Sequence, residues 1–268
     1  MDRVDLFQCA KVNLTLGING IKDGYHLLES IMVPIDLYDE ISIKKRNDDL
    51  VEVRYLTGEK YANDNALRVA LAIKEAYGLG GMDISISKGV PGGVGLGGSA
   101  VDGAGIAVAC EKLFNLSISN EFLVALGGDI PFLKSGVSAI VKGRGEEVAP
   151  ISLPKLYIIL VYGNTPVSTK EVFDRYDEIG GESGITGEFL NDLMPYNALE
   201  KGACELVPSI KNARTVLEEA GFTRVVMTGA GSGYIAFTPS KEEFDAKKER
   251  AMALARDRGL KAKIVNVL

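Results

Sequence analysis

The stretch "KGVPGGVGLGGSAVDG", residues 88–103, decides the fold because it places seven glycines between a strand-like and a helix-like segment. "MDISISK", residues 82–88, alternates before it, and "AVDGAGIAVACEKLF", residues 100–114, follows with helical character. Glycine adopts positive φ angles at little cost, so successive backbone N–H groups in such a loop converge on one point. The following helix N-terminus adds its dipole, and together they predict an anion site, most often for phosphate. A tight structural loop is the alternative interpretation.

The two commonest phosphate-binding patterns do not account for this loop. Gly93, Gly95 and Gly98 match G-x-G-x-x-G, but a dinucleotide-binding unit needs a second strand ending in an acidic residue about 20 positions further on. Here the helix leads to another helix-like segment, residues 120–128. The Walker pattern, a glycine loop ending in Lys and Ser or Thr, is absent from the sequence. A nicotinamide-dependent oxidoreductase is therefore disfavoured.

A longer pattern fits the loop, which reads P-x-G-x-G-L-G-x-S-A from Pro91 to Ala100. This pattern resembles the ATP loop of the GHMP kinases, the family of galactokinase, homoserine kinase and mevalonate kinase. Two more segments resemble motifs of that family and come in its order, "CAKVNLTLGING" at residues 9–20 and "MTGAGSGYIAF" at residues 227–237. The resemblance implies ATP as co-substrate, with Mg²⁺. It places the nucleotide at Pro91, Gly93, Gly95, Leu96, Gly97, Gly98, Ser99 and Ala100.

The same resemblance implies an α/β (α+β) fold of two domains. Residues 1–152 would form the N-terminal domain, similar to ribosomal protein S5 and carrying the ATP loop, and residues 153–268 a ferredoxin-like C-terminal domain. The proline spacing in "VAPISLPKL", residues 148–156, independently suggests a joint between domains. The last strand, residues 262–268, is expected in the second domain, with a return to the first domain as the alternative.

Local patterns predict the individual elements. A helix over residues 65–77 should begin at a cap, Asn63 or Asp64, and end at Gly78. The other elements are expected as strands at 4–18, 30–45, 51–55, 135–143, 156–162, 222–229, 234–237 and 262–268, and as helices near 169–178, near 196–219 and from Ser240.

Composition excludes several classes of function. A net charge of -6 argues against broad nucleic-acid binding, which needs a basic face. A single histidine leaves no material for a histidine triad or a multi-histidine metal site. Three widely spaced cysteines, Cys9, Cys110 and Cys204, suggest neither disulfides nor zinc. With no apolar span and no basic-then-apolar leader, we expect a cytoplasmic protein without a membrane partner.

The candidate catalytic residues lie in two of the segments that resemble the family. "GGDIPFL", residues 127–133, is similar to the family's Gly-x-Asp-Val-Pro-Phe segment. The resemblance implies that Asp129 orients or deprotonates the substrate hydroxyl, and that Lys11 keeps Asp129 ionised and neutralises developing charge. Without the resemblance, a turn or capping Asp129 and a solvated Lys11 at a strand edge are the simpler interpretations.

The candidate substrate residues follow from one branch of the family. Residues 10–29, "AKVNLTLGINGIKDGYHLLE", resemble the opening of a member that phosphorylates a cytidine diphosphate alcohol in non-mevalonate isoprenoid synthesis. The resemblance implies a cytosine stacked on Tyr25 and hydrogen-bonded by His26, with an aromatic ring on its other face. That ring would be Phe173, for which a core helix face is the equal alternative. The other substrate contacts implied are Asn13 and Thr169.

The loop also departs from the family pattern. Residues 97–101, Gly-Gly-Ser-Ala-Val, precede Asp102 where the family has Gly-Gly-Gly-Ser-Ser, so hydroxyl groups move or vanish and the metal ligands stay undefined. Two alternatives remain, another GHMP kinase acting on mevalonate or homoserine, and a non-catalytic nucleotide-binding module. Retention of Lys11 and Asp129 argues against the module. Nothing in the sequence indicates an oligomeric state.

Overall fold

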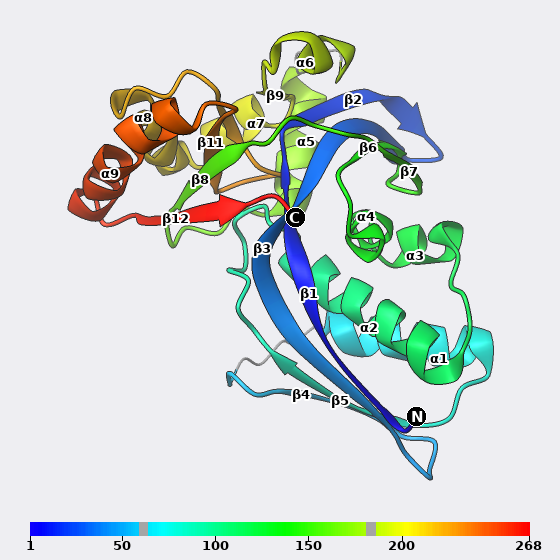
Figure 1. Cartoon of the computed structure of the whole chain (residues 1–268). Helices are drawn as coiled ribbons and strands as arrows, with labels where there is room; N and C mark the ends of the chain where they lie inside the picture. Colours follow the sequence, from blue (N-terminus) through cyan, green and yellow to red (C-terminus); the bar gives the residue numbers. More distant parts are fainter. Residues whose placement is uncertain (59–63, 181–185) are drawn as a thin grey trace.

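The computed structural model describes residues 1–58, 64–180 and 186–268, which form an eight-stranded and a four-stranded sheet (Figure 1). The first half of the chain contains β1 (Arg3–Asn13), β2 (Thr15–Lys22), β3 (Tyr25–Lys45), β4 (Val51–Tyr55), α1 (Asn65–Tyr77), β5 (Met82–Ser87), α2 (Gly98–Phe114), α3 (Asn120–Leu126), α4 (Ile130–Ser135), β6 (Ala139–Gly143) and β7 (Glu147–Pro150). The second half contains β8 (Tyr157–Tyr162), α5 (Thr169–Ile179), α6 (Thr186–Asp192), β9 (Tyr196–Asn197), α7 (Glu200–Leu206), the 3₁₀ helix η1 (Pro208–Ile210), α8 (Lys211–Glu219), β10 (Val225–Met227), β11 (Tyr234–Thr238), α9 (Lys241–Asp257) and β12 (Lys261–Asn266).

The long strand β3 organises the first sheet. It pairs antiparallel with β1, β2, β5 and β6 along different parts of its 21 residues. In the described residues the parallel pairs are β4 with β5 and β2 with β9. The sheet is therefore not the doubly wound parallel sheet of a dinucleotide-binding fold, in which ligands bind at the carboxyl ends of parallel strands.

The helix α2 packs closely against this sheet, as its small residues predict. It contacts β1 and β3 on one side and α1 and α4 on others (Figure 1). A Cβ at Gly105 would lie 2.1 Å from Cδ1 of Ile41, and one at Gly103 would lie 2.8 Å from Cδ1 of Ile130. The approach at Gly105 fixes α2 on the sheet and the approach at Gly103 fixes it against α4, and both position the glycine loop that leads into the helix.

The second sheet has the ferredoxin-like arrangement. Its order is β10-β11-β8-β12 and all its pairs are antiparallel. The elements come in the order strand, helices, two strands, helix, strand. The predicted α/β fold class is confirmed. The domain boundary at residues 152 and 153 stays a prediction.

The last strand joins the second sheet. β12 pairs with β8, and its last residue, Asn266, also donates from its backbone and side-chain N–H groups to the Asp36 carboxylate of β3 in the first sheet. There Val267 bridges to Ile35 and the N–H of Leu268 donates to Pro34. Both sheets are thus tied together at the end of the chain (Figure 1).

The helical structure predicted near residues 196–219 is confirmed from Glu200 onward, where α7, η1 and α8 lie, but it is interrupted and residues 196–197 form the strand β9 instead. Pro208 has no N–H and cannot extend α7, so a 3₁₀ turn replaces the helix there. The predicted helix over 65–77 is confirmed. Asp64 caps it by accepting from the N–H of Leu67, and Gly78 ends it with a φ of 62°. Asn63 lies outside the described residues.

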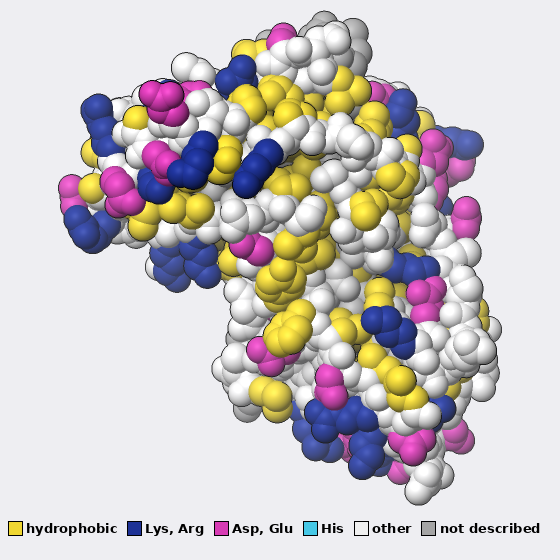
Figure 2. Space-filling view, viewed as in Figure 1, with side chains coloured by type: hydrophobic (Ala, Val, Ile, Leu, Met, Phe, Trp, Pro, Cys, Tyr) yellow, Lys and Arg dark blue, Asp and Glu magenta, His cyan; other side chains and the backbone are white. Residues whose placement is uncertain are grey.

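The surface shows no dominant charge on the face drawn in Figure 2. Acidic and basic side chains are mixed at both ends of the molecule, and hydrophobic side chains gather between them. Among the helices of the described residues, none has both the length and the hydropathy that a membrane crossing requires. The three cysteines are buried free thiols.

Candidate functional site

A cavity of about 900 Å³ brings together segments from both halves of the chain. Most of the predicted site residues line it: Lys11, Asn13, Tyr25, His26, Gly93, Gly95, Gly97, Gly98, Ser99, Ala100, Asp129, Thr169 and Phe173. Pro91 and Leu96 do not line it. Leu96 is buried, and its carbonyl accepts a bond from the backbone N–H of Lys11 at 3.3 Å. The volume lies near the upper end of the range that is usual for small-molecule sites.

Lys11 and Asp129 form an ion pair in this cavity. The Lys11 Nζ lies 3.2 Å from Oδ2 of Asp129, and the lysine is almost fully buried on β1. Asp129 stands at the N-cap position of α4, yet its side chain makes no capping hydrogen bond. The solvated lysine and the capping aspartate are thus both contradicted as interpretations. The carboxylate is free to meet a substrate, with a cation beside it.

Asn13 holds the Lys11 ammonium in place. Its Oδ1 accepts from Lys11 Nζ at 2.6 Å and from the N–H of Gly229 at 3.0 Å, while its Nδ2 donates to Ser30 at 2.8 Å. Asn13 is buried, so its amide groups are committed to these partners. Its predicted contact with the substrate stays a prediction, and in the structure it orients Lys11.

The glycine loop docks on the third glycine-rich segment. Gly93, Gly95 and Gly97 have positive φ angles of 71°, 80° and 76°. Thr228 donates from Oγ1 to the carbonyl of Gly95 at 3.2 Å, and the N–H of Gly233 donates to Val94 at 3.3 Å. The loop of residues 91–100 and the segment of residues 227–237, far apart in sequence, therefore form one backbone surface, the glycine cradle. Only glycine fits where their backbones come closest.

Tyr25, His26 and Phe173 lie in the same cavity at the start of β3 and on α5. The His26 and Phe173 rings are 4.8 Å apart, tilted by 36°, and His26 Nε2 lies 2.7 Å from Oδ1 of Asp177. Tyr25 is exposed, and the guanidinium of Arg144 lies over its ring at 5.1 Å. The predicted aromatic residues are thus together. Phe173 packs on His26 here, and its role toward a base stays a prediction.

Sequence patterns did not point to several polar residues of the cavity. Asn65, Lys88, Asp102 and Arg144 all line it. Lys88 is the first residue of the glycine-rich stretch 88–103, and Arg144 lies in the glycine turn "KGRGEE", residues 142–147. Each therefore adjoins a recognisable loop. Neither has a motif of its own, which is why pattern alone did not select them.

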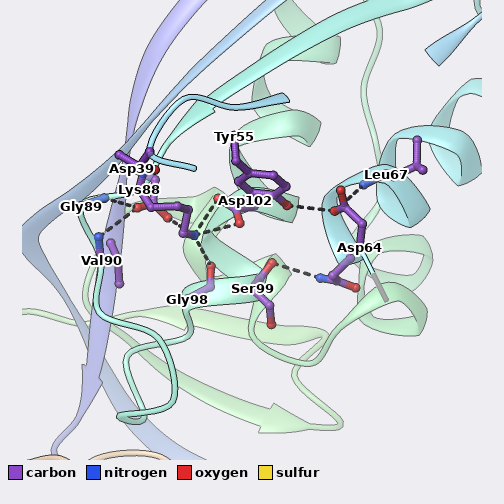
Figure 3. A network of polar contacts seen from close by, with 12 residues as sticks. Asp39, Tyr55, Asp64, Leu67, Lys88, Gly89, Val90, Gly98, Ser99 and Asp102 are labelled. Carbon is purple, nitrogen blue, oxygen red and sulfur yellow. Dashed lines mark hydrogen bonds and ion pairs between the residues drawn. The ribbon is translucent and has the colours of Figure 1, made fainter. Parts of the chain in front are cut away.

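Lys88, Asp39 and Asp102 form a buried ionic cluster beside the glycine loop (Figure 3). Burial alone would lower the pKa of Lys88, but Asp102 and Asp39 outweigh it and raise that pKa. Burial raises the pKa of Asp102 to about 7, against the opposing pull of Lys88. Asp102 must share this one cation with Asp39, so its carboxylate is only partly compensated.

This pKa predicts a pH dependence of stability. The folded state holds the Asp102 proton up to about pH 7, whereas the ordinary pKa is 3.8, so the free energy of unfolding falls as pH rises through that window. Asp102→Asn removes the effect. We expect its stability relative to the unmodified protein to rise by on the order of 1–3 kcal/mol between pH 5 and pH 8, measured by urea unfolding. A difference that stays constant with pH would contradict the assignment.

No group of three or more His, Cys, Asp or Glu side chains suited to a metal ion occurs within the described residues. Mg²⁺ commonly binds through substrate phosphates and water with one or two protein oxygens. Ser99 lines the cavity beside the glycine loop and offers a hydroxyl oxygen for that purpose.

Comparison with known proteins places the chain in a class. A model of the GHMP kinases N terminal domain matches residues 64–141, and one of the GHMP kinases C terminal region matches residues 185–255. A homoserine kinase from Cytophaga hutchinsonii superposes with a TM-score of 0.73 at 16% identity, covering 100% of this chain and 95% of that one, and so shares the fold. With this fold, its glycine cradle and its Lys–Asp pair, the chain belongs to the GHMP kinase family.

Two similar relatives and one similar solved structure within the family carry the name of the same enzyme. A 4-diphosphocytidyl-2-C-methyl-D-erythritol kinase from Caldicellulosiruptor saccharolyticus is 32% identical, covering 89% of each chain. The protein of the same name from Geobacter metallireducens is 35% identical, covering 87% of this chain and 89% of that protein. A crystal structure of 4-(cytidine 5'-diphospho)-2C-methyl-D-erythritol kinase matches with a TM-score of 0.78 at 28% identity, covering 98% of this chain and 99% of that one.

Proposed function

We propose that this chain transfers the γ-phosphoryl group of ATP to a hydroxyl of 4-diphosphocytidyl-2-C-methyl-D-erythritol in non-mevalonate isoprenoid synthesis. The observation that carries the proposal is one cavity lined by the glycine cradle, the Lys11–Asp129 pair and the aromatic residues Tyr25 and His26. The names of the relatives support the same substrate. They do not favour a mevalonate or homoserine substrate, since those kinases resemble the chain in fold at 16–17% identity.

The glycine cradle would receive the nucleotide phosphates. Positive φ angles at Gly93, Gly95 and Gly97 turn backbone N–H groups toward a common point, and α2 begins directly after them. Gly97 caps α2 without a side chain, so the positive end of the helix dipole lies open to an anion. Bound Mg²⁺ would neutralise phosphate charge, with the Ser99 hydroxyl as a protein ligand.

The Lys11–Asp129 pair would carry the transfer step. Asp129 accepts the proton of the substrate hydroxyl as its oxygen forms a bond to the γ-phosphorus, and the bond to the β–γ bridging oxygen breaks to release ADP. Lys11 stabilises the negative charge that spreads over the transferring group. Within the described residues, Lys11 Nζ contacts Asn13 and Asp129 and keeps a third N–H donor for phosphate.

Arg144 would complement the substrate diphosphate. Its guanidinium stands over the Tyr25 ring in the cavity and forms no ion pair among the described residues. A guanidinium that stacks on an aromatic ring can still donate to phosphate oxygens through its edge. The cytosine of the same substrate would stack on Tyr25.

We place the enzyme in the cytoplasm. Its cysteines are buried free thiols, and thiols stay reduced in that compartment.

Replacing Tyr25 with alanine tests the cytosine site. We expect Tyr25→Ala to raise KM for the cytidine substrate by roughly ten- to a hundredfold, since stacking on one base is worth about 1–3 kcal/mol. KM for ATP should change by less than about twofold, because Tyr25 lies outside the glycine cradle. Steady-state kinetics with each substrate varied in turn measures both constants.

Tyr77 provides the matched control. It is a partly buried tyrosine with an edge contact to Phe122, 5.7 Å between ring centroids, and it does not line the cavity. Tyr77→Ala should lower stability without separating the two KM values. Equal increases in both KM values for Tyr25→Ala would mean that Tyr25 is structural, and would remove the cytosine assignment.

A further inference from the structure

The side chain of Lys88 is fully committed to protein partners. Its Nζ lies 2.5 Å from Oδ2 of Asp39, 2.8 and 2.9 Å from the carboxylate oxygens of Asp102, and 3.1 Å from the carbonyl of Gly98 (Figure 3). An ammonium group has three N–H donors, and these three partners use them all. Lys88 therefore differs from Lys11, which has a donor left for a ligand.

The cluster contacts both ends of the glycine loop. At the entrance, Oδ1 of Asp39 accepts from the N–H groups of Gly89 and Val90 at 2.8 and 2.9 Å. At the exit, Lys88 donates to the Gly98 carbonyl in the first turn of α2. Asp39 belongs to β3 of the sheet, so the rigid sheet holds the two ends of residues 89–98 through one buried ion pair.

We propose that Lys88, Asp39 and Asp102 form a clamp that fixes the glycine loop in its phosphate-binding shape, which makes Lys88 and Asp39 positioning residues for ATP. The proposal rests on the proposed use of ATP. Its physical reason is preorganisation, because a loop that is already ordered loses less entropy when the nucleotide binds. Burying these charges costs desolvation free energy. The clamp keeps them because they hold the loop in one specific geometry, which its function requires.

The clamp predicts a selective loss of nucleotide affinity. Lys88→Met should weaken binding of AMP-PNP, a non-hydrolysable ATP analogue, by roughly ten- to a hundredfold. Binding of cytidine diphosphate at the Tyr25 end should change by less than about twofold, since that end uses β3, α5 and Arg144. Isothermal titration calorimetry of the whole chain with each ligand measures both affinities. Hydrogen exchange at the backbone amides of residues 92–97 should become faster.

Two further variants distinguish the loss of the clamp from a general loss of folding. At pH 8, where Asp102 is ionised, Lys88→Met/Asp102→Asn removes one charge of each sign and leaves Asp39 bonded to the loop entrance, so it is the variant used if Lys88→Met does not fold. Lys134→Met is the matched control. Lys134 also bridges a carboxylate and a carbonyl, Glu111 at 2.5 Å and Ile118 at 2.6 Å, but it does not line the cavity. Its AMP-PNP affinity should stay unchanged.

The outcomes separate the clamp from the proposed function. Weaker AMP-PNP binding with unchanged cytidine diphosphate binding in a folded clamp variant supports the clamp. Unchanged AMP-PNP affinity in the folded double variant, or equal losses for both ligands, overturns it while leaving ATP use intact. If the unmodified protein binds no AMP-PNP, the proposed function itself fails, and the clamp with it.

Discussion

Asp129→Asn is expected to lower kcat by on the order of 10²-fold or more while the chain still folds. Asparagine keeps the shape of the side chain but removes the charge that orients the hydroxyl and takes its proton. The partner cation Lys11 remains bonded to Asn13, so the rest of the site keeps its geometry. Phosphoryl transfer has a loose transition state, and part of the loss would therefore come from positioning. Single-turnover kinetics at saturating substrates measures the chemical step.

Asp174→Asn is the control for this change. Asp174 is an exposed aspartate on α5 that pairs with Lys170 at 2.5 Å, and it does not line the cavity. Its kcat should be within about twofold of the unmodified protein, because exposed ion pairs contribute little. Turnover by Asp129→Asn close to the unmodified rate would exclude both roles assigned to Asp129.

Gly95→Ala is expected to destabilise the chain by roughly 2–4 kcal/mol and to abolish nucleotide binding. Gly95 has a φ of 80°, and a Cβ there would lie 1.9 Å from the carbonyl oxygen of Thr228. The positive φ alone costs an L-residue about 1 kcal/mol, and the two nearest obstacles are backbone atoms of Thr228, which cannot rotate away as the end of a flexible side chain can. A fall in Tm of roughly 5–15 °C should appear in differential scanning calorimetry.

Gly92→Ala tests whether the loss of stability comes from the close contact between Gly95 and Thr228 or from any alanine in the loop. Gly92 belongs to the same loop, has no positive φ, and a Cβ there would meet nothing within 4 Å. Its Tm should stay within about 2 °C of the unmodified value. If the two variants melted at the same temperature, the close docking of the loop on Thr228 would not contribute to stability.

Local sequence signals predicted much of the fold, and they failed where tertiary contacts decide. Asp64 and Gly78 delimit α1 as expected, because a cap and a left-handed glycine act on their own helix. The short α4 and β7 were not predicted. Each spans few residues and is held by neighbours, α4 by α2 and β7 by β6. Periodicity over so short a run carries little information.

The candidate site was predictable where residues stand in motifs. The glycine loop, Lys11 and Asp129 could be selected in this way, and the structure gathers them in one cavity. Asp39 and Asp177 could not be selected from the sequence. Asp39 lies 49 positions before Lys88, and Asp177 lies 151 positions after His26, so only the folded chain brings each pair into contact.

The measurement that tests the central claim most directly is a transfer assay with ATP and Mg²⁺ and three acceptors side by side. The acceptors are 4-diphosphocytidyl-2-C-methyl-D-erythritol, mevalonate and homoserine, and phosphorylated product is followed by ³¹P NMR. The cavity with Tyr25, His26 and the Lys11–Asp129 pair predicts a phosphomonoester signal with the cytidine compound alone. Transfer to mevalonate or homoserine without transfer to the cytidine compound, or no transfer to any of the three, would contradict it.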